Sequence, residues 1–240
     1  MDAHIDTQAE DRDLRNRILD AAAALTANGD ITSLTTRTIA AAAAVQAPTL
    51  YRLFGDKQGL LDAVAERIWA AFVKDKAAMQ PHADPVQDLR EAWDRYVSFG
   101  LANPVAFAIM HGARAGSSTS TAVAAGLTVL RERVSRVAKA GRLSMPVERA
   151  VGLIHAMGLG TVTSLLAVPA PARDPQLATA ARDAVLSAIV DGSRGPAKHG
   201  LAPCAVALGA RLDESDGLTP GERMLLGELL TRLASPPDKL

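Results

Sequence analysis

The sequence predicts an all-α protein, and three observations lead to that prediction. The 240 residues are 48% apolar, which is enough to bury a core and excludes wholesale disorder. Only 3% are aromatic while alanine is abundant, a combination typical of helices packed through small side chains rather than of β-sandwiches or barrels. Apolar residues also recur every three or four positions in one segment after another. The length suits one or two domains.

The first 78 residues predict a tail and four helices. Residues 1–10 are polar and are expected to form a disordered tail. The helices are predicted over residues 11–27, 35–43, 47–54 and 56–78. A tight turn, Ala44-Val45-Gln46, joins the two short helices, and glycines at positions 29 and 55 supply helix stops.

Proline and glycine divide the rest of the chain into further helices. These are predicted over residues 86–101, 105–111, 122–140, 147–168, 174–191, 202–212 and 220–233. We expect a flexible loop or lid at residues 115–120 and a linker at residues 192–199. Thr219 and Glu222 form a capping box with Pro220 at the first helical position of the last helix. The apolar face of that helix consists of Leu225, Leu226, Leu229, Leu230 and Leu233.

One segment, residues 151–172, carries no charged residue over 22 positions and is long enough to cross a bilayer. It contains several glycines and hydroxyl residues, it ends in Pro169 and Pro171, and its flanks are not strongly basic. We therefore favour a helix buried on all sides, in a core or a subunit interface, over a membrane span.

The charge balance and the cysteine count narrow the class of protein. Lys and Arg number 26, as do Asp and Glu, so the net charge is zero and a polybasic nucleic-acid coat is excluded, although a locally basic surface is not. The single cysteine, Cys204, cannot form an intrachain disulfide, which fits a reducing cytoplasm. The N-terminal residues are acidic and polar, unlike a signal peptide. We expect a cytoplasmic protein.

No catalytic motif is present in the sequence. It contains no HxxxH, no GxSxG and no P-loop, and Gly158-Leu159-Gly160 lacks the third glycine of a dinucleotide loop. The five histidines are scattered, and Cys204 has no histidine nearby. We expect no enzyme activity, no metal and no cofactor.

The two short helices and their tight turn predict a helix-turn-helix, whose second helix can enter the major groove of DNA. Residues 32–57 carry Arg37, Arg52 and Lys57 against Asp56 alone, a local charge of three minus one, or +2. Hydroxyl side chains surround these cations, as phosphate anchoring requires. Arg37 and Gln46 are able to form two hydrogen bonds to a base edge.

These residues resemble the TetR family of bacterial transcriptional repressors. The matching string is Ile39-Ala40, followed by Val45-Gln46-Ala47-Pro48-Thr49-Leu50-Tyr51-Arg52-Leu53-Phe54-Gly55-Asp56-Lys57-Gln58-Gly59-Leu60, with Ile18-Leu19-Asp20-Ala21-Ala22 ahead of it. Two positions depart from the family pattern, since Ala44 stands where glycine is usual and Leu53 where histidine is usual. A Cβ at a left-handed turn position costs about 1 kcal/mol.

The resemblance implies a division of the chain and a set of DNA contacts. It implies a helix-turn-helix DNA-binding domain at 11–58, a helical ligand-binding and dimerisation domain at 59–194, and at 195–240 a linker with extra helices that pack on the second domain. Thr36, Arg37 and Thr38 begin the first short helix, Gln46 and Thr49 read bases, and Ala47 and Pro48 suit a thymine methyl. Tyr51, Arg52 and Lys57 are implied phosphate contacts, while Leu50 and Phe54 point inward.

The resemblance also implies a homodimer that binds palindromic operator DNA and releases it when a small-molecule effector binds. Helices 147–168 and 174–191 are the expected dimer interface, because their small residues permit close approach. The candidate pocket for a largely apolar effector contains Trp93, Tyr96, Phe107, Met110, His111, His155 and Met157. The alternative is a helical protein–protein interaction module that has lost specific DNA binding.

Overall fold

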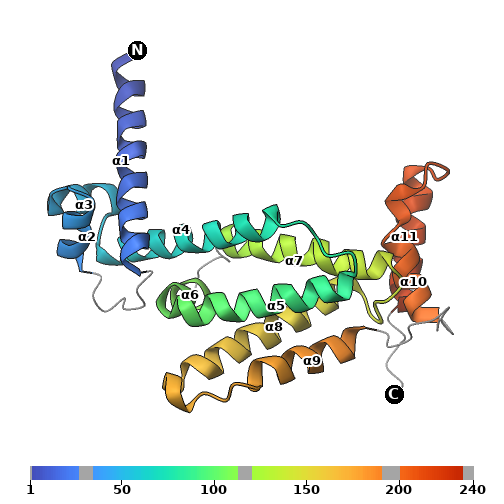
Figure 1. Cartoon of the computed structure of the whole chain (residues 1–240). Helices are drawn as coiled ribbons and strands as arrows, with labels where there is room; N and C mark the ends of the chain where they lie inside the picture. The colour runs from blue at the N-terminus through green and yellow to red at the C-terminus, as the bar shows by residue number, and fades with distance from the viewer. Residues whose placement is uncertain (1, 27–34, 113–120, 191–200, 235–240) are drawn as a thin grey trace. The chain divides into compact units, whose positions relative to one another are not determined.

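Helices make up the regular secondary structure of the described chain (Figure 1). The computed structural model describes residues 2–26, 35–112, 121–190 and 201–234, and this part contains eleven α-helices, two short 3-10 helices and no β-strand. The all-α prediction is therefore confirmed. The α-helices are α1 (Asp2–Thr26), α2 (Thr36–Ala42), α3 (Ala47–Phe54), α4 (Lys57–Ala78), α5 (Pro85–Ala102), α6 (Pro104–His111), α7 (Thr121–Lys139), α8 (Val147–Leu166), α9 (Leu177–Ile189), α10 (Leu201–Gly209) and α11 (Pro220–Ala234).

Most helices begin and end within one or two residues of the predicted positions, and the exceptions have local causes. Helix α1 begins at Asp2, so residues 2–10 are helical and not the predicted disordered tail. This segment has no glycine or proline, and its first turns carry acidic residues that favour a helix N-terminus. Helix α9 begins at Leu177 rather than at residue 174, because the Asp174 carboxylate accepts a hydrogen bond from the Gln176 N–H and holds a turn there. The predicted loop at 115–120, the linker at 192–199 and the Asn28-Gly29 stop lie outside the described residues.

The chain folds into two compact units that do not follow the predicted domain boundaries. One unit comprises Met1–Ala78 with Ser98–Ala125, and the other comprises Met79–Val97 with Gly126–Leu240. Helices α4 and α6, which we expected in the second domain, belong to the first unit because α6 packs along α4. The boundaries between the units fall inside α5 and α7.

The core of the first unit holds the two short helices in place. Ile18 of α1, Ile39 of α2, Leu50 of α3 and Leu60 of α4 are each at most 1% exposed and belong to one hydrophobic cluster. Leu50 thus points inward, as predicted. Because every one of the four helices contributes a fully buried side chain, α3 is fixed against α1, α2 and α4.

In the second unit, an ionic network ties α5 to α7. Asp88, only 3% exposed, accepts hydrogen bonds from the guanidinium groups of Arg133 and Arg136, and Arg136 also donates to the His82 carbonyl at 2.7 Å. One buried carboxylate thus accepts hydrogen bonds from two cations of α7. Such an arrangement stabilises the packing only while every partner is present.

Helix α8 is buried on one face and exposed on the other, so the prediction that it is buried on all sides is wrong for a single chain. Its buried face includes Gly158, where an added Cβ would lie 3.2 Å from the Tyr96 ring. Its opposite face exposes Leu153 and Met157. By length and hydropathy α8 is the one helix of the described residues that passes the criteria for a membrane span, with 39% of that window buried.

Candidate nucleic-acid interface

Helix α2 begins with a complete capping box. The Thr38 N–H donates to Thr35 Oγ1 at 3.1 Å, and the Thr35 N–H donates to Thr38 Oγ1 at 3.0 Å. The Thr38 hydroxyl also donates to the Thr35 carbonyl at 2.9 Å. Thr38, which we expected at the DNA surface, is exposed but uses its hydroxyl to hold the start of α2.

The turn between α2 and α3 places Ala44, which stands where glycine is usual in the family, in a left-handed conformation. Ala44 has a φ of +54°, in the left-handed region that glycine occupies at least cost. The turn is closed by hydrogen bonds from the Ala44 N–H to the Ala41 carbonyl and from the Val45 N–H to the Ala40 carbonyl. The chain therefore makes the turn with alanine and bears the steric cost.

Helix α3 presents one face to solvent and one to the core. Leu50 is buried, whereas Gln46, Ala47 and Pro48 are exposed at the start of the helix. Gln46 is the N-cap residue of α3, but its side chain makes no capping hydrogen bond. Its amide is thus not engaged in capping, and Pro48 lies in the first turn, where its missing N–H costs nothing.

The structure brings all ten predicted contact residues onto α2, α3 and the residues at their ends. Those exposed to solvent are Arg37, Thr38, Gln46, Ala47, Pro48, Tyr51, Arg52 and Lys57, and those half-buried are Thr36 and Thr49. Gly55 ends α3 with a φ of +80°, and Lys57 begins α4 two residues later. The surface combines cations, hydroxyls and an amide around an exposed helix, which is the chemistry needed to hold phosphates and read base edges.

An acidic residue of α1 forms an ion pair with one of these cations. Arg52 donates from Nη1 and Nη2 to the two carboxylate oxygens of Asp11, each at 2.8 Å. These hydrogen bonds lower the pKa of Asp11 and raise that of Arg52. The two residues are 41 positions apart, so the sequence pattern of α3 gave no sign of the pair.

A cation of α1 also lies against α3. The Arg15 guanidinium lies 4.7 Å from the centre of the Phe54 ring, a cation–π distance. The contact holds the α1 cation beside the end of α3, where Phe54 is half-buried against the core as predicted.

The predicted effector-pocket residues fall into two groups, one in each unit. In the first unit, His111 stacks on Phe107 with ring centroids 4.3 Å apart and lies edge-on to Trp69 at 5.1 Å. Phe72 and Phe99 extend the same aromatic cluster, and Met110 is half-buried.

In the second unit, Trp93 and Tyr96 pack against Gly158 of α8. The Trp93 indole donates to the Ala178 carbonyl at 3.0 Å, and burial raises the pKa of Tyr96. Half-burial lowers the pKa of His155. Met157 does not belong to this group, because it lies on the exposed face of α8 and is 43% exposed.

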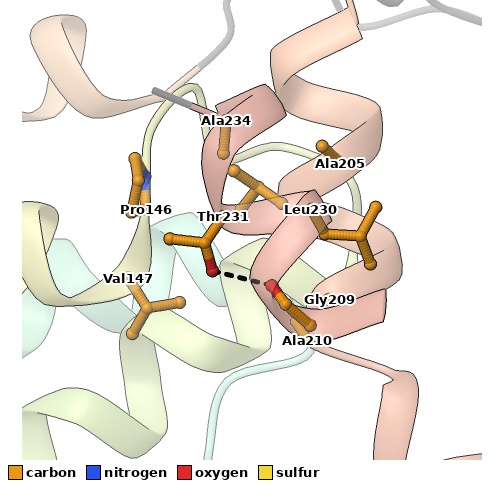
Figure 2. Close-up of a pocket in the computed structure, with 10 residues that line it drawn as sticks. Pro146, Val147, Ala205, Gly209, Ala210, Leu230, Thr231 and Ala234 are labelled. Carbon is orange, nitrogen blue, oxygen red and sulfur yellow. Dashed lines mark hydrogen bonds between the residues drawn. The ribbon is translucent and has the colours of Figure 1, made fainter. Parts of the chain in front are cut away.

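A cavity of about 360 Å³ lies elsewhere in the second unit (Figure 2). None of the predicted pocket residues lines it; its walls come from the start of α8 and from α10 and α11. Among the described residues, no group of three or more His, Cys, Asp or Glu side chains is placed to hold a metal ion.

An exposed helix held by a tight turn against three others defines the class of this protein as a helix-turn-helix DNA-binding protein. Comparison with known proteins finds a family that the N-terminal segment matches. Residues 18–64 match the family described as bacterial regulatory proteins, tetR family. No curated protein matches the chain.

Solved structures share the fold over most of the chain. SmeT, the repressor of the Stenotrophomonas maltophilia multidrug efflux pump SmeDEF, is 23% identical with a TM-score of 0.52, covering 75% of this chain and 91% of SmeT. RolR in complex with resorcinol is 16% identical with a TM-score of 0.57, covering 88% and 97%. A TetR variant from Acinetobacter baumannii in complex with minocycline is 23% identical with a TM-score of 0.50, covering 71% and 90%.

Residues 18–64 thus match the TetR family of transcriptional regulators, and solved structures that include a TetR variant share the fold of the chain. Members of this family are DNA-binding regulators and not enzymes, in agreement with the sequence-based expectation.

Proposed function

We propose that the protein is a homodimeric cytoplasmic repressor that binds a palindromic operator and leaves it when a small, largely apolar effector binds. The observation that carries the proposal is the exposed start of α3, where Gln46, Ala47 and Pro48 stand clear of a fully buried Leu50. A recognition helix needs this division, because its outer face must enter the major groove while its inner face is held rigidly.

Each contact residue has a role that its position supports. Gln46 and Thr49 read base edges from the first turn of α3, and Arg37 reaches a base or a phosphate from α2. Tyr51, Arg52 and Lys57 bind phosphates beside the groove. Two copies of α3 in one dimer enter successive major grooves, roughly 34–36 Å apart.

The exposed face of α8 supports the dimer. Leu153 and Met157 of α8 and Leu177 of α9 are large apolar residues in contact with solvent, and the exposed Gly152 and Gly160 let a second helix approach closely. Helices α8 and α9 pack on each other, so two copies would join as a four-helix interface. The apolar composition of α8 then serves this contact rather than a bilayer.

The ligands seen with structural neighbours support an effector of the proposed class. SmeT has been solved with triclosan, RolR with resorcinol and a TetR variant with minocycline. The half-buried His155 and the largely buried Tyr96 supply polar atoms in an apolar setting in the second unit, and Phe107, Met110 and His111 supply an aromatic setting in the first. An effector that prefers one separation of the two α3 helices lowers operator affinity in proportion to that preference.

Titration of operator DNA at increasing salt tests the proposal. Wild-type affinity should fall steeply, and Arg52→Ala and Lys57→Ala should each reduce the slope of log K against log salt by about 0.9, the share of one phosphate contact. Arg67→Ala is a matched control, because Arg67 is an exposed cation of α4 whose partner is Asp20 of α1. A flat salt response would contradict DNA binding and favour the helical interaction module.

A further inference from the structure

Helices α10 and α11 form an antiparallel hairpin in the second unit. A Cβ placed on Gly209 would lie 4.0 Å from Leu230, and one placed on Gly227 would lie 3.6 Å from Leu212. Residue numbers therefore rise from Gly209 to Leu212 as they fall from Leu230 to Gly227, as expected for two antiparallel helices in contact. The two helices are the orange and red ribbons of Figure 1.

One side of the hairpin covers the start of α8. Pro146 and Val147 face Ala205 and Gly209 of α10 and Leu230 of α11 across the cavity shown in Figure 2. Side chains on this side are small or buried, and Thr231 donates its hydroxyl to the Gly227 carbonyl at 2.9 Å. This inner side of the hairpin thus has its partner within the chain.

The outer side of the hairpin is an uncovered row of leucines. Leu201 and Leu208 share one face of α10, and Leu225, Leu229 and Leu233 follow each other every fourth residue on α11. None of these leucines lines the cavity beside α8, whose walls come from other faces of the two helices, such as Ala205 of α10 and Leu230 of α11. These five residues, here called the leucine face, are between 43% and 66% exposed.

We propose that the leucine face binds the leucine face of a second copy of this chain, so that two hairpins form a four-helix bundle. Five large apolar side chains that are exposed on two adjacent helices indicate an interaction surface, whereas leucines scattered singly over a surface do not. Helix α10 has no charged residue in its nine positions, and such a helix is normally buried on all sides.

The charges of the hairpin argue against a membrane or a nucleic acid as the partner. Residues 201–234 carry three cations and five anions, a net charge of −2, so neither an anionic membrane nor nucleic acid is attracted. Glu228 and Arg232 lie one turn apart on α11 and pair with each other. In an antiparallel pairing of two α11 helices about a two-fold axis, each Glu228 meets the Arg232 of the other copy, so the edge is self-complementary.

The leucine-face contact uses a different surface from the α8 and α9 dimer of the proposed function. Only the tetramer described below rests on that proposed function. The inner side of the hairpin lies next to the first residues of α8, and none of the leucine-face residues lines that junction. The proposed dimer face consists of other residues, Leu153 and Met157, further along α8. A dimer formed through α8 and α9 therefore leaves two leucine faces free. Pairing of these faces joins two dimers into a tetramer that presents two pairs of α3 helices.

Sedimentation of the full chain tests the proposal with three variants. Leu225→Glu/Leu229→Glu, which charges the leucine face, should convert a tetramer into a dimer that still binds a single operator duplex with wild-type affinity. Met224→Glu is the matched control, because Met224 is 76% exposed on the same helix but lies off the leucine face; it should leave the tetramer intact. Met157→Glu on α8 should also give a dimer, but one that no longer binds a palindrome.

These outcomes separate the two contacts. If the wild type is a dimer and Leu225→Glu/Leu229→Glu does not change its size, the leucine-face contact is contradicted and the α8 dimer is not. A dimer that Met157→Glu leaves unchanged, with operator binding retained, would instead contradict the α8 interface.

Cys204 provides a second readout that does not depend on assembly size. It is the one cysteine of the sequence, it is exposed, and it shares the α10 face of Leu201 and Leu208. A short bis-maleimide should link two wild-type chains through Cys204, and the link should be lost in Leu225→Glu/Leu229→Glu but not in Met224→Glu. Equal cross-linking in all three proteins would contradict the contact.

Discussion

Asp11 and Arg52 show how a single carboxylate adjusts a surface built to hold phosphates. Arg52 donates two hydrogen bonds of 2.8 Å to Asp11, yet the Arg52 side chain is 55% exposed and the Asp11 side chain 38%, so exchange of the carboxylate for a DNA phosphate costs little. Asp11 also cancels one of the few positive charges beside α3. The pair therefore weakens general attraction to DNA more than it stabilises the fold.

Asp11→Asn should accordingly strengthen binding to any duplex by roughly two- to fivefold at low salt and steepen the salt slope, since Arg52 becomes free for a phosphate. Because Arg52 lowers the pKa of Asp11, the carboxylate stays charged from pH 6 to 8 and the effect should be constant over that range. Asp20→Asn removes the same charge from α1 beside Arg67 and is the control. Equal gains in both variants, measured by fluorescence anisotropy, would contradict a specific role for Asp11.

Ala44 is the residue at which the backbone bears a cost. With φ at +54°, replacing Ala44 by glycine removes a Cβ clash at the price of a more flexible unfolded chain. Ala44→Gly should therefore raise the free energy of unfolding by about 0.5–1 kcal/mol, measured by urea denaturation. Ala43→Gly, one residue earlier at the end of α2 with a φ of −86°, should destabilise instead. A loss of stability in Ala44→Gly would show that the turn is not strained.

At the scale of elements, the junction of α5 with α7 depends on one buried carboxylate. Asp88→Ala removes the buried carboxylate that accepts hydrogen bonds from Arg133, itself 9% exposed, and from Arg136. We expect a loss of about 3–5 kcal/mol, seen as a lower melting temperature. Asp94→Ala on the same helix removes an exposed carboxylate from Arg182, which keeps its pair with Asp183, and should change the melting temperature little. Similar shifts in the two variants would contradict a special role for the buried network.

For the whole molecule, helix positions were predictable to the extent that they depend on local pattern. The start of α3 and its end at Gly55, the cap at Asp56 and the Thr219–Glu222 capping box all follow from residues within one turn of each other. The early start of α1 was missed because polar composition was taken as disorder, although acidic residues favour a helix N-terminus.

What the sequence did not reveal depends on contacts between distant residues. Periodicity shows that Leu225 and Leu229 lie on an apolar stripe, but not that α10 covers only Leu230 and its neighbours and leaves them exposed. In the same way, it shows that α6 is apolar but not that α6 packs along α4 in the first unit. The helix-turn-helix itself could be predicted because it is a local motif, and the DNA contacts assigned to its residues stay a prediction.

The central claim is that α3 reads DNA as one of a pair. Selection of bound duplexes from a random library, followed by sequencing, tests this claim most directly with the full-length protein and its Gln46→Ala variant. The account predicts enrichment of an inverted repeat whose half-sites are centred about one helical turn apart, and loss of preference at one base of each half-site in Gln46→Ala. Recovery of no common sequence, or of the same sequence with equal preference by both proteins, would contradict it.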